Sequence, residues 1–326
     1  MVFFTPELQF CVNRLNVKYN PQAPPPKVFL SYLRDLLETD DIITLQEYLG
    51  YILIPSLKAQ AMLSIIGKGG EGKSVLGKII EDLFGNNMTE GKFHKIETNN
   101  FFRANLAGKL VFVDDDLRLE KLPSTEYIKS LVTIEIATNI ERKYQQSYCE
   151  KLYARFFCFG NKAISSQNDK THGFSRRMII LSTKSIPKDR IVNPSIAEEI
   201  IVEKEGVFNW MFAGLMRLLS NNFQFSLSAK TKLNISEMSR ENCNIIEFLY
   251  SPNVVAFSKS AETSSKDLYA CYSRWCKDNE ISAIESPTFI SWVRSNEDKY
   301  NISYSTHVKK SDSGNVRGFK GVAIIS

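Results

Sequence analysis

Apolar residues change their spacing near residue 60, and the change predicts how the chain is built. Over residues 27–57 they recur at helical spacing, which predicts a small group of helices. Residues 62–66 form a short continuous apolar run, as in a buried strand, and residues 75–84 return to helical spacing. We therefore expect a helical collar followed by a strand, a loop and a helix.

The alternation of strands and helices continues to about residue 185. Apolar strands are predicted at residues 110–113, 154–160 and 178–181, with helical segments such as 101–106 and 127–131 between them. Strands that alternate with helices indicate a parallel sheet that is covered on both faces. The predicted fold class is therefore α/β.

The chain divides into four predicted parts. Several prolines, which fix φ and lack a backbone donor, make the first 26 residues an extended lead-in, and residues 190–250 are mainly helical. The parts are the lead-in with the collar (1–58), the core (59–189), a helical segment that packs on the core (190–257) and a C-terminal domain (258–326).

The C-terminal domain has the pattern of a winged helix. Residues 258–265 have the polar composition of a linker, residues 266–276 and 286–294 are predicted helices, and residues 300–325 form a predicted β-hairpin. Lys309, Lys310 and Arg317 lie on the predicted wing, and helix 286–294 is the one that would enter a major groove. Duplex DNA binding is one interpretation, and a packing or oligomerisation module is the other.

The loop after the strand at 62–66 has the phosphate-binding pattern G-x-x-x-x-G-K-[ST] over residues 67–74. Its glycines allow backbone N–H groups to surround a polyphosphate, and the following helix directs its positive dipole end at the anion. Lys73 is expected to reach the β- and γ-phosphates, and the Ser74 hydroxyl is expected to bind Mg²⁺. The residues assigned to nucleotide binding are Gly67, Gly69, Gly70, Glu71, Gly72, Lys73, Ser74 and Val75.

Three consecutive acids follow the apolar strand at 110–113. In a phosphate-loop enzyme the first such acid holds Mg²⁺ through water, and the next polarises the attacking water. We assign Asp114 to the metal and Asp115 to the base, with Asp116 as the base if the strand is shifted by one residue.

Two further sites follow later strands. Asn161 at the end of strand 154–160 is either a turn former or a hydrogen-bond partner of the attacking water or the γ-phosphate. Arg176 and Arg177 are either a solvated pair or arginine fingers that reach a neighbouring subunit's γ-phosphate.

Composition adds only weak constraints. A net charge of +5 and a pI near 8.7 permit contact with nucleic acid without requiring it. The six cysteines include no C-x-x-C pair, and there are only three histidines, so a zinc site is disfavoured and reduced thiols are expected. No apolar run is long enough to cross a bilayer and no leader pattern is present, which favours a cytoplasmic protein.

The motifs together resemble superfamily 3 helicases of the AAA+ class. The resemblance rests on the order of phosphate loop, acidic strand, basic hairpin, strand ending in Asn161 and the sequence Gly-Phe-Ser-Arg-Arg at 173–177. It is specifically to the helicase part of phage and plasmid primase-helicases and mobile-island replication initiators. Residues 15–23 and 45–51 also resemble the sequence that precedes the ATP site in those proteins.

The resemblance implies an AAA+ core that uses ATP and Mg²⁺ in a homo-oligomeric ring, usually a hexamer, translocating on single-stranded DNA from 3′ to 5′. It places Arg142, Lys143 and Lys151 of the hairpin region 134–152 near DNA phosphates, although a basic edge strand in solvent has the same pattern. The expected protein is a helicase and replication initiator of a mobile genetic element, with single-stranded and duplex DNA as partners. A non-translocating ATPase that acts as a helicase loader or DNA-assembly switch is the alternative.

Overall fold

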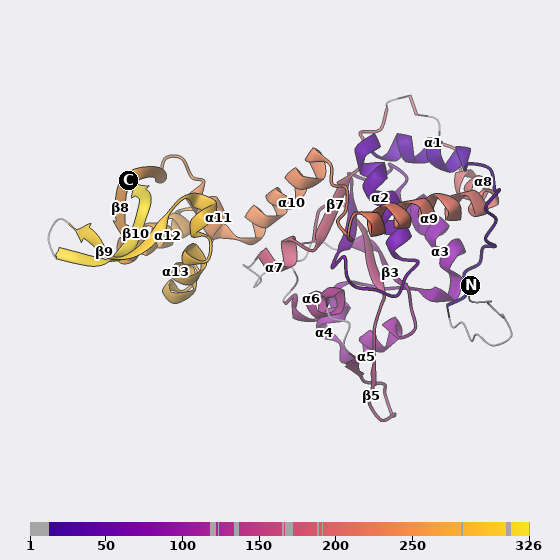
Figure 1. Cartoon of the computed structure of the whole chain (residues 1–326), viewed down its shortest axis with the longest axis horizontal. Coiled ribbons are helices and arrows are strands. Elements are labelled where there is room, and N and C mark those ends of the chain that lie inside the picture. Colours follow the sequence, from indigo (N-terminus) through magenta and orange to yellow (C-terminus); the bar gives the residue numbers. More distant parts are fainter. Residues whose placement is uncertain are drawn as a thin grey trace. The chain divides into compact units, whose positions relative to one another are not determined.

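The computed structural model describes residues 13–117, 122, 124–133, 137–164, 166, 172–187, 189–190, 192–281, 283–310 and 314–325 (Figure 1). Contacts along the chain separate two compact units, Met1–Met238 and Ser239–Ser326, which are described in turn. Within the described ranges, no helix combines the length and apolar character that a membrane span requires.

A five-stranded sheet forms the centre of the first unit. Its order is β2 (Met88–Glu90), β3 (Val111–Leu117), β6 (Arg155–Gly160), β1 (Met62–Ile66) and β7 (Met178–Ser182), and every neighbouring pair is parallel. All of β6 is buried because helices cover both faces, as the continuous apolar runs require. The predicted α/β fold with a parallel sheet is confirmed, and the carboxyl ends of the strands share one edge.

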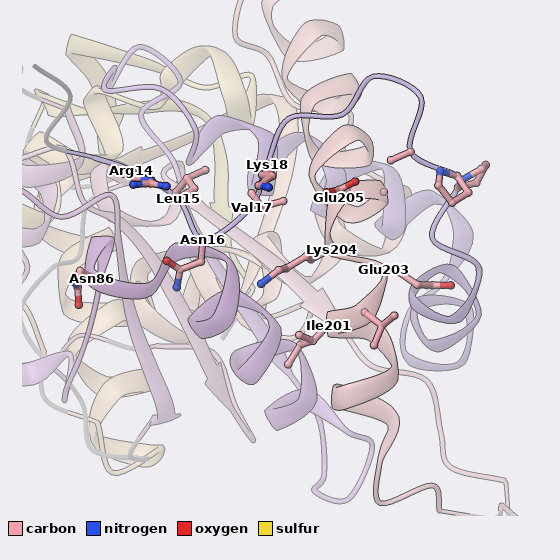
Figure 2. Close-up of a pocket in the computed structure, with 15 residues that line it drawn as sticks. Arg14, Leu15, Asn16, Val17, Lys18, Asn86, Ile201, Glu203, Lys204 and Glu205 are labelled. Atoms are coloured by element: carbon pink, nitrogen blue, oxygen red, sulfur yellow. The ribbon is translucent and has the colours of Figure 1, made fainter. Parts of the chain in front are cut away.

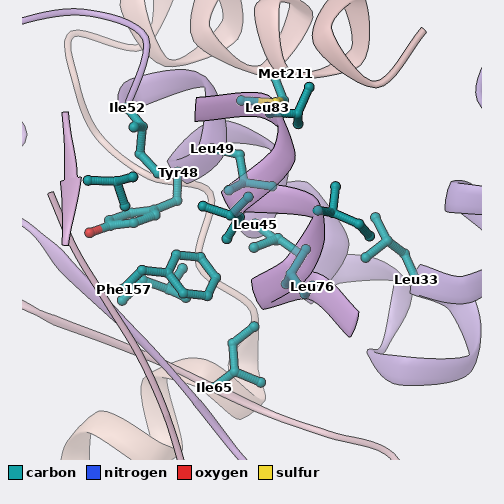
Figure 3. Close-up of a cluster of buried hydrophobic side chains, with 14 of the residues drawn as sticks. Leu33, Leu45, Tyr48, Leu49, Ile52, Ile65, Leu76, Leu83, Phe157 and Met211 are labelled. Atoms are coloured by element: carbon teal, nitrogen blue, oxygen red, sulfur yellow. The ribbon is translucent and has the colours of Figure 1, made fainter. Parts of the chain in front are cut away.

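One face of the sheet is covered by helices from both ends of the unit (Figure 1). The helices predicted for residues 27–57 are present as α1 (Lys27–Leu36) and α2 (Thr39–Tyr51). The same face is also covered by α3 (Lys73–Phe84), α8 (Ile196–Val202) and α9 (Lys204–Ser220). In the shared core Tyr48 of α2 lies against Phe157 of β6 (Figure 3). Its hydroxyl donates to the Phe156 carbonyl at 2.6 Å, which fastens α2 to the sheet.

Glycines allow α2 and α9 to approach closely. A Cβ atom at Gly50 of α2 or at Gly214 of α9 would collide with the backbone of the other helix. The Arg217 guanidinium of α9 then donates to the buried Glu47 carboxylate of α2 at 2.7 Å. This packing joins α9, which follows the last strand of the sheet in sequence, to α2, which precedes the first strand.

Other elements, most of them short, cover the other face. They are α4 (His94–Thr98), α5 (Asn100–Arg103), α6 (Glu126–Thr133), the hairpin of β4 (Thr138–Ile140) and β5 (Tyr148–Glu150), α7 (His172–Ser175) and α10 (Ala229–Asn242). Two 3-10 turns, Gly85–Asn87 and Ala104–Leu106, connect elements of this unit. The predicted hairpin of residues 134–152 is confirmed as β4 and β5, while residues 134–136 lie outside the described ranges.

The second unit packs helices against a three-stranded antiparallel sheet of order β8-β10-β9. Its elements are α11 (Asn244–Leu249), β8 (Val255–Ser264), α12 (Ser265–Asp278), α13 (Ser286–Arg294), α14 (Glu297–Tyr300), β9 (Ser303–Lys310) and β10 (Gly314–Ile324). The predicted helices and terminal hairpin are confirmed as α12, α13, β9 and β10. Phe248, Tyr272 and Phe289 pack together in its core.

The linker predicted at residues 258–265 is wrong. Residues 258–264 belong to β8, which pairs with β10, and α12 begins at Ser265 directly afterwards. β8 is an edge strand whose central residues are exposed, so it carries as many polar side chains as a linker does. Composition alone does not separate the two.

Candidate nucleotide-binding site

The predicted phosphate loop joins the carboxyl end of β1 to the first residue of α3. Gly69, Gly70 and Gly72 have φ values of 108°, 83° and 103°. Side chains with a Cβ rarely adopt these values, so the loop requires glycine at these positions. Gly72 caps α3 without a side-chain hydrogen bond, and the first turn of a helix has N–H groups with no partner inside the helix. The loop and the start of α3 therefore have the geometry that favours an anion.

An acid within the loop contacts the loop's own cation. The two Glu71 carboxylate oxygens accept from the Gly69 N–H at 2.9 and 3.0 Å, and the Lys73 ammonium lies 2.8 Å from one of them. Burial raises the pKa of Glu71, but the hydrogen bonds from Lys73 and Gly69 outweigh it, so the pKa is below its ordinary value. The Glu71 side chain thus occupies both the Gly69 N–H and the Lys73 ammonium.

The acidic end of β3 distinguishes the predicted carboxylates. Asp114 is 2 % exposed, and its carboxylate accepts from the Phe93 N–H at 2.7 Å. The side chain of Asp115 is 75 % exposed. Asp116 is also exposed, and its N–H donates to the Asp114 carboxylate at 3.3 Å.

Lys92 lies against this acidic end. Its ammonium is 3.2 Å from Asp114, 3.0 Å from Asp115 and 3.2 Å from the Asp116 carbonyl oxygen. Burial lowers the pKa of Lys92. The interactions with Asp115 and Asp114 raise it by more than burial lowers it, so the pKa is above its ordinary value. The carboxylates predicted for the metal and the base therefore share one cation.

The pairing register of the strands places the sequence motifs at the same edge of the sheet. Gly160 of β6 pairs with Ile66 of β1 on one side and with Leu117 of β3 on the other. Asn161 follows Gly160 and is exposed, while Ser74, the predicted metal ligand of the loop, is exposed in the first turn of α3. The phosphate loop follows β1, Asn161 follows β6 and the acids lie in the second half of β3, so all three lie toward the carboxyl ends of adjacent strands.

The two arginines predicted as fingers differ in surroundings. Arg176 is exposed, whereas Arg177 is partly buried and its guanidinium donates to the Gly173 carbonyl of the same turn. The backbone carbonyl of Arg177 also accepts from the Met62 N–H at 2.8 Å, at the start of β1. Of the pair, Arg176 is the one whose side chain is available to another molecule.

Two residues that the motifs did not indicate hold the loop. The Arg190 guanidinium donates to the carbonyls of Gly70 and Glu71 at 3.2 and 3.0 Å. The Tyr32 hydroxyl of α1 donates to the Gly72 carbonyl at 2.9 Å, and burial raises the pKa of Tyr32. Tyr32 follows the apolar pattern of a core residue and Arg190 lies in a polar stretch, so only a three-dimensional contact identifies them.

A cavity of about 480 Å³ lies beside the loop. Tyr32 and Arg190 contribute to its wall together with apolar side chains from α1, α3 and α8 and the segment before α8. These are Val28, Val75, Val192 and Ile196. The lining also includes Lys27, Asp35 and Asn193, and the size of the cavity lies within the range of small-molecule sites.

A second cavity, of about 1040 Å³, lies between the lead-in and helices α8 and α9 (Figure 2). None of the predicted site residues lines it. The two acids that line it have hydrogen-bond partners within the protein. Glu203 accepts from the Val28 N–H at 2.9 Å, and Glu205 accepts from the Asn20 side-chain amide at 2.9 Å. Lys204 of α9 pairs with Asp82 of α3 at 3.2 Å. Glu205 therefore fastens the lead-in, Glu203 holds the start of α1, and Lys204 joins α9 to α3.

The predicted DNA-binding residues lie in both units. Arg142 and Lys143 are exposed between β4 and β5, and Lys151 is exposed just after β5. Arg317 is exposed on β10 of the second unit. Lys309 and Lys310 end β9, and their side chains lie outside the described part of the structure.

Comparison with known proteins shows the fold. Residues 65–177 match the sequence model of a family of unknown function, DUF5906. None of the curated proteins compared with the chain matches it significantly. An apo structure of the NrS-1 C-terminal region (305–718) has a TM-score of 0.59 and 17% identity, covering 94% of this chain and 78% of that chain.

Two further structures of the same region agree. An A-form apo structure of the NrS-1 C-terminal region has a TM-score of 0.57 at 16% identity, covering 94% of this chain and 78% of that chain. Another A-form structure has a TM-score of 0.55 at 16% identity, covering 94% and 77%. This chain therefore shares a fold with the NrS-1 C-terminal region over nearly the whole length of this chain.

Proposed function

We propose that this protein is an ATP-dependent, ring-forming DNA helicase of the AAA+ superfamily 3 type, acting as a replication initiator of a mobile genetic element. The observation that carries the proposal is the meeting of the phosphate loop, the β3 acids and Asn161 at adjacent carboxyl ends of one parallel sheet. Open α/β sheets bind ligands at this edge.

ATP would lie along the loop with its phosphates at the start of α3. Lys73 would contact the β- and γ-phosphates, and Asn161 would orient the attacking water. The 480 Å³ cavity beside the loop would take the nucleoside, with Tyr32 and Arg190 in its wall. Exposed Arg176 would reach the γ-phosphate of a neighbouring subunit, where a planar cation stabilises the charge of the transition state.

The residues at this edge fit Mg²⁺ because their donors are hard oxygens. Mg²⁺ is usually bound through one or two protein side chains together with substrate phosphates. Ser74 and Asp114 would hold the ion, which neutralises charge on the phosphates when bound. Asp115, which is exposed at the end of β3, would accept the proton of the attacking water.

DNA would contact both units. Arg142, Lys143 and Lys151 at the β4–β5 hairpin would bind the phosphates of a single strand in the ring. The second unit, in which α12 and α13 pack on a three-stranded sheet, would act as a winged helix, with duplex contacts from Arg317, Lys309 and Lys310.

Unwinding of tailed duplexes tests the proposal. We expect the protein to unwind a duplex with a 3′ single-stranded tail in the presence of ATP and Mg²⁺, and not one with a 5′ tail. Lys73→Ala should lower both ATP hydrolysis and unwinding roughly a hundredfold or more, because it removes a preorganised phosphate contact. Lys78→Ala, which removes an exposed lysine of the same helix, is the control. ATP hydrolysis without unwinding of either substrate would identify a loader instead.

A further inference from the structure

The tip of the β4–β5 hairpin presents one aromatic ring to solvent. Tyr144 lies between β4 and β5 and has a relative exposure of 104%. Its φ is +60°, a conformation that bulky residues rarely adopt, and the turn is closed by a hydrogen bond from the Gln145 N–H to the Arg142 carbonyl at 3.2 Å. The backbone thus holds the tyrosine outward at the tip.

The cations beside Tyr144 lie near other aromatic rings. The Arg142 guanidinium is 5.2 Å from the ring centre of Tyr148 on β5, and the Lys143 ammonium is 5.8 Å from that of Phe101 on α5. Both cations remain exposed. The hairpin tip therefore offers a free aromatic face next to two positive charges that sit on supporting rings.

This combination fits a single-stranded polynucleotide. An unpaired strand offers phosphates to the cations and the face of a base to the ring, and stacking on an aromatic side chain is available to every base. In a duplex the base faces are already stacked on one another, so the ring would gain nothing there. The chemistry of the tip therefore discriminates unpaired from paired DNA.

We propose that Tyr144 stacks on an unpaired base of single-stranded DNA while Arg142 and Lys143 bind the adjacent phosphates. The inference rests on the proposed DNA-binding role of the hairpin and adds to it the group that recognises the base. In this arrangement Tyr144 contacts a base, while the two cations of the hairpin contact the DNA backbone.

A base-deletion cycle tests the stacking. The full chain and its Tyr144→Ala and Tyr144→Phe variants are titrated, by fluorescence anisotropy, with labelled oligothymidylate and with an abasic deoxyribose-phosphate chain of equal length. Tyr144→Ala should weaken oligothymidylate binding roughly five- to hundredfold and leave abasic-chain binding unchanged. Tyr144→Phe, which keeps the ring, should bind both strands like the native protein.

Charge variants separate the two kinds of contact. Arg142→Gln with Lys143→Gln should weaken both strands alike and reduce the slope of log affinity against log salt by about 1.4 for two lost phosphate contacts. Tyr144→Ala should leave that slope unchanged. Equal weakening of the two strands by Tyr144→Ala would contradict stacking and indicate a structural role.

The remaining outcomes separate this inference from the function it rests on. If the native protein binds oligothymidylate and Tyr144→Ala binds it equally well, the stacking is wrong and the helicase proposal stands. If the native protein binds neither strand, both are wrong. If Tyr144→Ala changes the sedimentation of the DNA-free protein and leaves DNA affinity intact, the tip is a contact between copies of the chain, and the stacking is again wrong.

Discussion

The ends of β1 and β3 carry opposite charges, and each is paired with a nearby side chain of the same chain. At the end of β1, the Lys73 ammonium lies 2.8 Å from the Glu71 carboxylate. At the end of β3, the Asp114 carboxylate lies 3.2 Å from the Lys92 ammonium. In the proposed function an ATP phosphate would replace Glu71 at the first end, and Mg²⁺ would replace Lys92 at the second.

The two pairs differ in burial and origin. Glu71 and Lys73 are two residues apart, and their side chains are 5% and 11% exposed. Lys92 comes from 22 residues before Asp114 and its side chain is 30% exposed. The Asp114 side chain is only 2% exposed, so this second pair is partly exposed through its lysine alone. Because exposed ion pairs contribute little free energy and buried ones are costly to break, we expect the Glu71–Lys73 pair to be more difficult to separate than the Lys92–Asp114 pair.

The acids of β3 give the largest expected effect. Asp114→Asn and Asp115→Asn should each lower the rate of ATP hydrolysis roughly a hundredfold or more, because one removes the proposed metal ligand and the other the proposed base. Asp114→Asn should also raise the Mg²⁺ requirement, whereas Asp115→Asn should not. Steady-state hydrolysis measured over a range of Mg²⁺ concentrations separates these two losses.

Asp116→Asn is the matched control for the acidic end. Its side chain is exposed and the register of β3 places it beyond the proposed base, so the hydrolysis rate should stay within about twofold of native. A large loss in Asp116→Asn with a normal Asp115→Asn would show that the base lies one residue further along. The proposed base would then be Asp116 in place of Asp115.

Glu71→Gln should tighten ATP binding about tenfold. The substitution keeps the size of the side chain but removes the charge that competes with phosphate for Lys73 and the Gly69 N–H. Isothermal titration with a non-hydrolysable ATP analogue measures the change. Glu81→Gln, an exposed charge removal on the same helix, should leave affinity unchanged. Weaker binding by Glu71→Gln would mean that Glu71 is part of the nucleotide shell and not a competitor.

The pH dependence of stability sharpens the role of Glu71. Its pKa is lower in the folded chain than in the unfolded chain, so as pH falls the unfolded state takes up the proton first. The contact therefore stabilises the fold above the ordinary glutamate pKa of about 4.3 and is lost as pH falls through the lowered value. Urea unfolding from pH 3 to 7 should show a shallower acid loss for Glu71→Gln than for the native chain. Equal slopes would contradict this contribution.

The sequence predicted the parts of the site that depend on neighbours in the chain. The loop glycines, Lys73 and the acids of β3 follow apolar strands directly, so local pattern locates them. The partners of these groups come from elsewhere: Lys92 is 22 residues from Asp114, and Arg190 is 119 residues from Glu71. No local pattern encodes such pairs.

The local sequence pattern also failed to predict structure where the same kinds of residue occur in two different structures. The polar residues of β8 are typical of a linker, and only pairing with β10 makes them a strand. Arg176 and Arg177 are adjacent and chemically identical, and only the fold directs Arg177 to the Gly173 carbonyl. Tyr144 is one of several aromatic residues in its region, and its exposure follows from the turn that carries it.

Lys92→Met gives the smallest expected effect and tests the other half of the comparison. Removing the cation frees the Asp114 and Asp115 carboxylates for Mg²⁺, so half-maximal ATP hydrolysis should need up to about fivefold less Mg²⁺, the range of an exposed pair. Lys95→Met, an exposed charge removal on α4, is the control. An unchanged or higher Mg²⁺ requirement would mean that Lys92 does not compete with the metal. A gain as large as that of Glu71→Gln would mean that burial does not distinguish the two ends, since the partly exposed Lys92–Asp114 pair would then be as difficult to separate as the Glu71–Lys73 pair.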